Sequence, residues 1–259
     1  MSKSRLGQNF LYDPSILCRI IQTAELSPED TVAEIGPGPG KLTSLLAKKV
    51  KQVIAIELDK TLFERLRGDF IGYSNVNLIH SDALKFPFET IGKFKVVANI
   101  PYYITTPIIF KLLEARASLQ TMTLTVQKEV AERIVAPPGK KDYGVLSIML
   151  QYYTLPELKF IIPKEAFRPV PKVDSAVLHI RILEKPAIEP KDEKIFFNVV
   201  RTAFSQRRKT IHNSLKSLGK DIFDILAKAG IDPQRRAETI SSLEFAKLSD
   251  LLVENLEQK

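Results

Sequence analysis

Glu34-Ile-Gly-Pro-Gly-Pro-Gly40 is the stretch that decides the fold of this chain. It lies between a β-type run, Thr31–Ile35, and a segment in which Leu42, Leu45 and Leu46 recur at helical spacing. Glycines here let the backbone adopt conformations that a Cβ would block, and let a ligand approach it closely. A tight structural turn is the alternative, because a glycine-rich turn by itself is only a moderately specific signal.

Outward from this turn, β-type runs alternate with helical segments from about residue 31 to 127. The expected strands are Thr31–Ile35, Gln52–Ile56, Val76–His80, Lys95–Ala98 and Met122–Val126. Strands separated by helices predict a parallel sheet with right-handed crossovers. A helix carrying Val145, Ile148 and Met149 then leads to β-type runs at Leu158–Ile162 and Ala176–Ile182, which we expect to form an antiparallel edge. The predicted fold class is therefore α/β, with a Rossmann-like, mainly parallel sheet.

The composition changes where Pro186 and Pro190 bracket a short polar connection. Beyond it the pattern is helical: apolar residues recur at i, i+3, i+4, i+7 and i+8 from Phe196 to Phe204. We therefore predict an α/β domain over residues 1–186 and a small all-helical domain over residues 187–259.

The chain has 259 residues, of which 44% are hydrophobic and 26% charged, and a net charge of +8. This charge is compatible with a polyanionic partner but does not prove one. Because no apolar run reaches membrane-spanning length and the N-terminus leads into no signal-like apolar core, we expect a cytoplasmic protein without a membrane partner. Cys18 is expected to be a buried or half-buried small hydrophobe.

Acidic residues follow the next two expected strands. Glu57, in Glu57-Leu-Asp59, ends one strand, and a carboxylate there can accept both hydroxyls of a ribose. This position does not distinguish NAD from S-adenosylmethionine, although dinucleotide enzymes usually space their glycines G-x-G-x-x-G rather than G-x-G-x-G. Asp82 follows the third strand and can accept a hydrogen from an adenine amino group, while a helix N-cap or turn residue is the alternative.

Asn99-Ile-Pro-Tyr102 lies at the carboxyl end of the fourth expected strand, where open α/β sheets bind ligands. An exocyclic amino nitrogen of a base is a poor nucleophile because its lone pair is delocalised into the ring. The Asn99 side-chain oxygen and the Pro101 carbonyl can each accept one of its N–H hydrogens, and Tyr102 can stack on a base turned out of its helix or loop. A plain turn is the alternative, which the preceding glycine turn, Glu57 and Asp82 argue against.

Together these features predict methylation of an exocyclic amino group on a nucleobase, with S-adenosylmethionine as the cofactor. Because the methyl group already sits on a sulfonium, no nucleophilic side chain is needed, and alignment and hydrogen bonding supply the catalysis. No metal is predicted, since His80, His179 and His212 show no metal-ligand spacing.

The chain closely resembles the small-subunit ribosomal RNA adenine dimethyltransferases, the KsgA-type family. The resemblance runs from Gly7-Gln-Asn-Phe-Leu11 to the helical tail and includes Gln127–Arg133 and Phe167–Ser175. It implies a class I methyltransferase domain that binds S-adenosylmethionine, with a small helical domain behind it. It also implies transfer of four methyl groups to N6 of two adjacent adenines in the hairpin loop near the 3′ end of 16S rRNA, during small-subunit biogenesis.

The resemblance also suggests roles for individual residues. Asn9 and Leu11 would close over the cofactor. Gly36 would contact the amino-acid end of the cofactor, and Gly38 would also bind the cofactor. Glu57 would hold the ribose and Asp82 the adenine, while Asn99 would touch both the cofactor region and the target amine. Phe167 would flank the flipped base opposite Tyr102, so the catalytic set is Asn99, Pro101, Tyr102 and Phe167.

Basic residues gather in the stretch 201–220, which contains no acidic residue. With the family in view, we expect RNA contacts from Arg133, Arg201, Arg207, Arg208 and Lys209. A merely solvated helical face is the alternative. The partner implied is 16S rRNA within a small ribosomal subunit or its precursor, bound by a monomer.

Three rival functions stay open. A large-subunit rRNA adenine methyltransferase of the antibiotic-resistance type is the nearest, and Gln127–Arg133 and Phe167–Ser175 favour the small-subunit family over it. A non-catalytic ribosome-assembly or transcription factor is a second rival, against which the intact Asn99, Pro101 and Tyr102 argue. A DNA amino-methyltransferase is disfavoured because only about 70 helical residues remain for target recognition.

Overall fold

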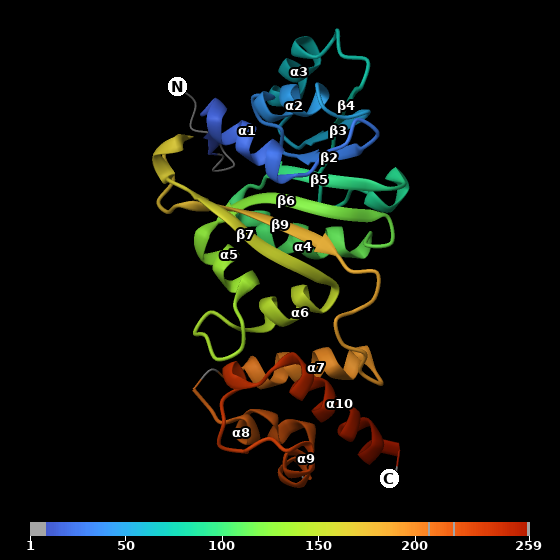
Figure 1. The fold of residues 1–259 in the computed structure, drawn as a ribbon, viewed down its shortest axis with the longest axis vertical. Coiled ribbons are helices and arrows are strands. Elements are labelled where there is room, and N and C mark those ends of the chain that lie inside the picture. Colours follow the sequence, from blue (N-terminus) through green and yellow to red (C-terminus); the bar gives the residue numbers. More distant parts are fainter. Residues whose placement is uncertain (1–8, 207, 220, 258–259) are drawn as a thin grey trace. The chain divides into compact units, whose positions relative to one another are not determined.

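The computed structural model describes residues 9–206, 208–219 and 221–257. They divide into two compact units. The sheet unit comprises the described parts of Met1–Ala131 and Pro156–Ile182, and the helical unit those of Glu132–Leu155 and Leu183–Lys259. Figure 1 shows the elements of each unit along the chain. Arg207 lies outside the described residues.

A seven-stranded sheet forms the centre of the sheet unit, counted over the described residues. In spatial order its strands are β4 (Val76–His80), β3 (Gln52–Glu57), β2 (Thr31–Ile35), β5 (Phe94–Asn99), β6 (Leu119–Gln127), β9 (Ser175–Ile182) and β7 (Thr154–Ile162). The pairs from β4 to β6 are parallel, and β9 runs antiparallel to β6. The predicted mainly parallel sheet with an antiparallel edge is confirmed.

The strand order reverses between β2 and β5. From β2 the chain continues outward to β3 and β4, and it then returns to place β5 on the opposite side of β2. Val32 and Ala33 of β2 pair with Lys95 and Val96 of β5. Open α/β sheets bind ligands at such a reversal, outside the carboxyl ends of the strands. The glycine turn after β2 and Asn99 at the end of β5 both lie there.

Helices connect these strands: α1 (Pro14–Thr23), α2 (Lys41–Ala47), α3 (Lys60–Asp69), α4 (Thr105–Glu114) and α5 (Lys128–Val135), with the 3-10 turn η2 (Tyr102–Ile104) before α4. Aspartates begin two of them. The Asp13 carboxylate accepts the Ser15 N–H at 2.8 Å, and the Asp59 carboxylate accepts the Thr61 N–H at 2.8 Å. Asp59 therefore caps α3, a structural task within the Glu57-Leu-Asp59 stretch.

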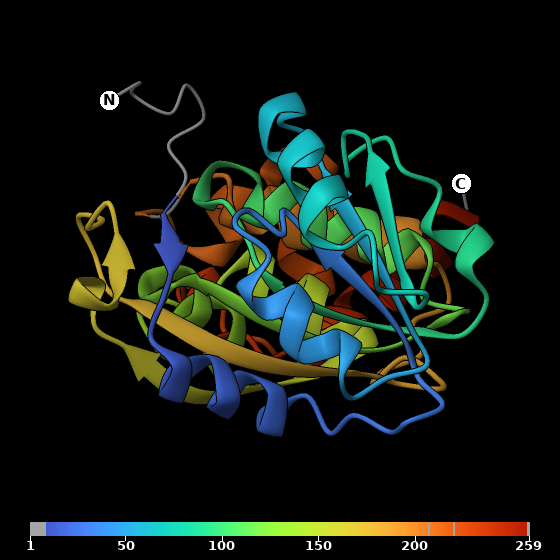
Figure 2. The same ribbon diagram turned by 90° about the horizontal axis from the view of Figure 1, so that it is seen from above.

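One face of the sheet is covered by α1 and α2, which lie side by side in Figure 2. Leu17 and Ile20 of α1 and Leu46 of α2 pack in one buried cluster with Val32 and Val53 of the strands. Removal of such side chains from water is the main force that holds the helices on the sheet. Cys18 lies beside this buried stripe on α1 and is exposed, so the expectation of a buried or half-buried side chain was wrong.

A second, two-stranded sheet pairs β1 (Phe10–Leu11) antiparallel with β8 (Phe167–Arg168). The sequence did not predict these two short strands. Two residues are too few to show a period of alternation, so only the tertiary structure reveals the pairing.

The helical unit contains α6 (Val145–Tyr153), α7 (Glu193–Phe204), α8 (Ile211–Leu215), α9 (Ile222–Ala229) and α10 (Ser242–Glu257), with the short turn η5 (Ala237–Thr239) before α10. Its core includes Phe196, Val200, Leu226 and Phe245, none of which is measurably exposed.

The two compact units do not coincide with the predicted division at residue 186/187. Residues 132–155 group with the C-terminal helices. Tyr152 of α6 stacks on Phe196 of α7, with ring centroids 5.4 Å apart, and Ile148 joins the same buried cluster. Helical periodicity locates α6 but does not say which core it joins, because that depends on contacts far away in the sequence. No helix among the described residues is long and apolar enough to cross a membrane.

Candidate functional site

The glycine turn begins with a residue that borders three cavities. Gly36 has a left-handed backbone, with φ of +65°, which favours glycine over any residue with a side chain. Its N–H donates to the Ile56 carbonyl of β3 at 2.9 Å, which fixes the turn against the sheet. Because Gly36 lines all three cavities, they lie next to one another around this turn, and we call the three together the strip.

Gly38 brings an aromatic ring against the same turn. It also has a positive φ, +57°, and a Cβ on it would lie 2.7 Å from Cε1 of Phe10. The Gly38 N–H donates to Oε2 of Glu57 at 3.1 Å. The absence of a side chain at this position therefore serves two purposes: it permits the left-handed turn and the close contact with Phe10.

Glu57 and Asp82 share the widest cavity of the strip, of about 120 Å³. Glu57 is 1% exposed, and its Oε1 also accepts the Asp59 N–H at 2.9 Å. Burial raises the pKa of Glu57, against the opposing effect of these hydrogen bonds. Oδ1 of Asp82 accepts the Leu84 N–H at 2.9 Å, so Asp82 is both a turn residue and a wall of the cavity. Each carboxylate can accept further hydrogen bonds.

Asn99 lies on the other side of Gly36, at a narrow cavity of about 20 Å³ that Pro101 and Tyr102 also line. Nδ2 of Asn99 donates to the backbone carbonyl of Asn9 at 3.1 Å. Because this contact uses the amide nitrogen, Oδ1 is left on the opposite side of the carboxamide as an acceptor. The backbone of Asn9 therefore orients Asn99.

Pro101 and Tyr102 are held in the turn η2. The Pro101 carbonyl accepts the Ile104 N–H at 3.1 Å, and a carbonyl oxygen has a second lone pair for another donor. The Tyr102 hydroxyl lies 2.8 Å from Oγ of Ser175, a fully buried residue at the start of β9. Burial raises the pKa of Tyr102, so the hydroxyl stays protonated at neutral pH. Sequence reasoning missed Ser175, which is 73 residues away from its partner.

Phe167 is placed differently from the expectation, whereas Leu11 is not. Phe167 has no exposed surface, and it pairs with Leu11 across β1 and β8. Both side chains belong to the buried cluster of the sheet unit. The structure therefore offers no Phe167 ring surface to a base, and the base contact stays a prediction. Leu11 also lines a cavity of about 30 Å³ beside Asn99, which fits its predicted place near the cofactor.

Glu34 borders the same small cavity as Leu11 and was not among the predicted site residues. It is 2% exposed, and its Oε2 has no hydrogen-bond partner among the described residues. Burial raises the pKa of Glu34 to about 8. An acidic residue at the end of a buried strand, directly before the glycines, was the available sequence signal.

The predicted RNA-binding residues of the described chain lie in the helical unit. Arg133, Arg201, Arg208 and Lys209 are all exposed. Nη2 of Arg201 lies 4.0 Å from the Met149 sulfur. The structure thus presents these cations to solvent, and their contact with RNA stays a prediction.

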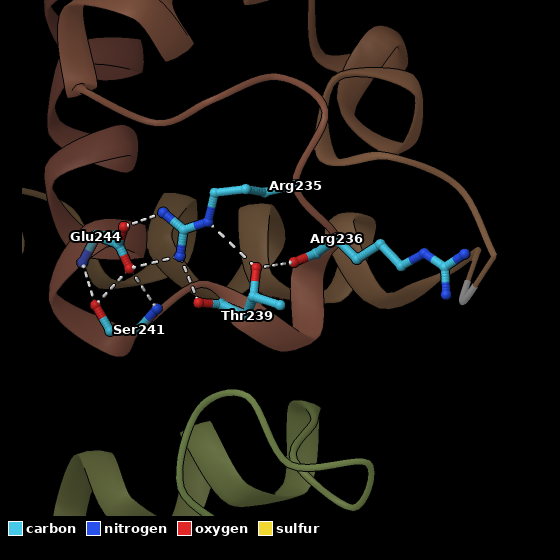
Figure 3. Close-up of polar contacts among 5 residues, drawn as sticks. All are labelled: Arg235, Arg236, Thr239, Ser241 and Glu244. Carbon is cyan, nitrogen blue, oxygen red and sulfur yellow. Dashed lines mark hydrogen bonds and ion pairs between the residues drawn. The ribbon is translucent and has the colours of Figure 1, made fainter.

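An ion pair fixes the loop that precedes α10 (Figure 3). The Arg235 guanidinium binds both carboxylate oxygens of Glu244, and its Nε donates to the Thr239 hydroxyl at 3.2 Å. Ser241 and Glu244 cap each other at the start of α10. Burial acts to raise the pKa of Glu244, but hydrogen bonds from Arg235 and Ser241 outweigh it and lower this pKa to about 2. The guanidinium of Arg236 points away from this network (Figure 3).

Known proteins match this arrangement over nearly the whole chain. The family model described as "Ribosomal RNA adenine dimethylase" matches residues 1–254. The chain belongs to this family. The ribosomal RNA small subunit methyltransferase A of Clostridium botulinum (strain Loch Maree / Type A3) is 49% identical, covering 97% of this chain and 94% of that protein. The protein of the same name from Moorella thermoacetica is also 49% identical, over 96% of this chain and 92% of the relative.

Solved structures agree. A dimethyladenosine transferase from Plasmodium falciparum superposes with a TM-score of 0.82 at 29% identity, covering 96% of this chain and 98% of that one. The 23S rRNA methyltransferase ErmE superposes with a TM-score of 0.75 at 30% identity, covering 95% of this chain and 100% of that one. Both support the Rossmann-like methyltransferase fold.

Membership of this family makes the chain an S-adenosylmethionine-dependent rRNA adenine dimethyltransferase, as the sequence predicted. The residues present fit this cofactor. The glycine turn leaves room for close approach, Glu57 and Asp82 offer acceptors in the widest cavity, and Glu34 has a buried oxygen without a partner.

Proposed function

We propose that this protein transfers methyl groups from S-adenosylmethionine to N6 of two adjacent adenines in the hairpin loop near the 3′ end of 16S rRNA. The product would carry two N6-dimethyladenines, made during small-subunit biogenesis. The observation that carries the chemistry is that Asn99 and Pro101, each with an acceptor oxygen, line one cavity at the end of β5 next to the glycine turn. The choice of the small-subunit RNA rests on relatives that are 47–49% identical and named for that subunit.

The residues would act by holding the amine. Asn99 and Pro101 each accept one N–H hydrogen of the target amine, which directs the nitrogen lone pair toward the methyl carbon. The new N–C bond forms as the C–S bond breaks, and the electron pair of that bond stays on sulfur. The amine then loses its extra proton to water. A group that aligns the two reactants in this way removes much of the barrier without a general base.

The cofactor would lie along the strip of three cavities. We assign its adenosine to the cavity of Glu57 and Asp82, with Glu57 at the ribose hydroxyls and Asp82 at the adenine amino group. Its amino-acid end would lie near Gly36 and Gly38, under Asn9 and Leu11. The positive φ of both glycines supports close approach of a ligand to the turn, and the larger volume of the cavity of Glu57 and Asp82 supports placing the adenosine there.

RNA contacts outside the site are assigned to the helical unit, through Arg133, Arg201, Arg207, Arg208 and Lys209. A variant with Arg208→Ala and Lys209→Ala should reduce the slope of log affinity against log salt by about 1.5–2 in fluorescence-based RNA titrations. Lys194→Ala with Lys247→Ala, in the same unit, serves as a charge-matched control. A slope unchanged from the wild-type protein would mean that this stretch is solvated surface.

The function is tested by methyl transfer from labelled S-adenosylmethionine to unmethylated small subunits, followed by mass spectrometry of the digested RNA. Two adjacent N6-dimethyladenines near the 3′ end are expected. Label in large-subunit RNA instead would favour the activity in the name of ErmE, and label in DNA would favour a DNA enzyme. Cofactor binding without any transfer would support a non-catalytic assembly factor.

Two further parts of the proposal concern the protein's state. We place it in the cytoplasm as a monomer that acts on 16S rRNA within a small ribosomal subunit or its precursor. Light scattering of the purified protein tests the monomer, and cell fractionation tests the compartment.

A further inference from the structure

Two consecutive tyrosines in the turn η2 border different cavities. Tyr102 lines the narrow cavity of Asn99, whereas Tyr103 lines the wide cavity of Glu57 and Asp82. Neighbouring side chains in a tight turn point in different directions, so one short segment can serve two sites. Tyr102 has a buried hydrogen-bond partner in Ser175, while the Tyr103 side chain is 56% exposed.

Tyr103 shares its cavity with a second exposed apolar side chain. Leu58, directly after Glu57, is 45% exposed and lines the same cavity. Burial raises the pKa of Tyr103, and the carboxylates of Asp82 and Glu57 raise it further, which places the phenol within electrostatic range of both. A tyrosine and a leucine left open to water beside two carboxylates suit a ligand with a flat apolar ring and polar edges.

We propose that the Tyr103 ring is the outer wall of the adenosine pocket and contacts the adenine face of the bound cofactor. This inference rests on the proposed direction of the cofactor, with adenosine in the cavity of Glu57 and Asp82. The contact buries the exposed ring surface on binding, and it acts on every ligand that contains adenosine. Tyr103 is thus a cofactor-affinity residue, while Tyr102, its neighbour, faces the target amine.

The expected consequence is a division of kinetic effects between the two tyrosines. Tyr103→Ala raises KM for S-adenosylmethionine and leaves kcat at saturating cofactor within about twofold, because the ring contacts the adenosine and not the reacting atoms. Tyr102→Ala instead lowers kcat/KM for the RNA. A Tyr103→Ala variant that lost kcat with an unchanged KM for the cofactor would overturn the assignment.

Calorimetry on the full chain measures the contact directly. We expect Tyr103→Ala to weaken S-adenosylhomocysteine binding by about three- to tenfold, in the range of an aromatic contact. The loss should be the same for 5′-methylthioadenosine, which lacks the amino-acid end. Tyr103→Phe should stay within about twofold of the wild-type protein, because the ring and not the hydroxyl makes the contact.

Tyr73 provides the matched control. It is 37% exposed and lies just before the amino end of β4, whereas Asp82 lies just beyond the carboxyl end of the same strand. Tyr73→Ala should leave the binding of both ligands unchanged. If Tyr103→Ala bound as tightly as Tyr73→Ala, or if Tyr103→Phe lost as much as Tyr103→Ala, the proposal would be wrong.

A fluorescence experiment gives a second test, because the chain contains no tryptophan. Tyr103→Trp and Tyr73→Trp each introduce a single tryptophan, which can be excited selectively over the tyrosines. Saturating S-adenosylhomocysteine should shift or quench the emission at position 103 and leave that at position 73 unchanged. Equal responses at the two positions would contradict a local contact.

The failure of this inference is distinguishable from the failure of the proposed function. Glu57→Ala should weaken binding of the same ligands if adenosine occupies this cavity. Weaker binding by Glu57→Ala with no effect of Tyr103→Ala would remove only Tyr103 from the pocket. No effect of either variant would remove adenosine from this cavity altogether.

Discussion

The two sides of Gly36 differ in how much space they leave. On one side, Glu57 and Asp82 border a cavity of about 120 Å³, with Tyr103 and Leu58 exposed at its rim. On the other side, the cavity of Asn99 measures about 20 Å³. The wide side is built from strand ends and their turns, whereas the narrow side is closed by a segment from the N-terminal part of the chain.

Phe10 and its neighbours account for the difference. The Phe10 ring lies against Gly38, and the Asn9 carbonyl accepts the Asn99 amide. Next to them, Leu11 pairs with Phe167 in the two-stranded sheet. The comparison teaches that the side proposed for adenosine is the more open one, while the side proposed for the target amine is shaped by contacts with β1. Variants on the two sides should therefore affect different steps.

Asn99→Ala is expected to have the largest effect. It removes an acceptor from the target amine on the narrow side, so methyl transfer should fall by about 100-fold or more. Calorimetry with S-adenosylmethionine should show binding that is at least partly intact. Unchanged turnover would remove Asn99 from the amine contact. Association of this variant with immature small subunits, despite lost methylation, would support an assembly role beside catalysis.

Glu57→Ala acts on the wide side and should weaken cofactor binding by about 10- to 100-fold, since a buried charge-assisted acceptor is lost. The same variant leaves the Gly38 N–H without its partner, so part of the loss comes from the turn. Glu64→Ala, on the exposed face of α3, is the control and should bind normally. A dissociation constant equal to that of the control would exclude Glu57 from the pocket.

Ser175→Ala and Tyr102→Phe test how the narrow side is positioned. Each removes one hydroxyl of the 2.8 Å pair, and each should lower kcat/KM for the RNA by about three- to tenfold, in line with one lost hydrogen bond. The double variant should lose little more than either single one, because both remove the same interaction. Additive losses would mean that the two hydroxyls act separately.

Glu34→Gln is expected to have the smallest effect, visible as a pH dependence of stability. The pKa of Glu34 is raised from 4.5 to about 8 in the folded protein. The unfolded chain therefore releases this proton first, and wild-type stability falls as the pH rises through that interval. Thermal unfolding at several pH values should show the melting temperature of the variant rising relative to that of the wild-type protein from pH 5 to pH 8, by several degrees. Parallel pH profiles would contradict a buried, protonated Glu34.

Local patterns explain why much of this could be predicted from the sequence. The runs Thr31–Ile35 and Val76–His80 became strands with the predicted bounds, because short β-type runs between turns carry their own signal. The residues at the carboxyl ends of the predicted parallel strands could be placed too, since those ends lie at one edge of the sheet. This put Gly36, Glu57 and Asn99 together before any contact was known.

The tertiary structure alone decided what depends on pairs distant in the sequence. Asn9 reaches Asn99 across 90 residues, and Tyr102 reaches Ser175 across 73. The pairing of β1 with β8 buried Phe167, which sequence reasoning had placed beside the base. Sequence periodicity records which face of an element is apolar but not what covers that face. The sequence by itself therefore determined the fold class, the cofactor and the chemistry, whereas only the packing decided which side chains point into each cavity.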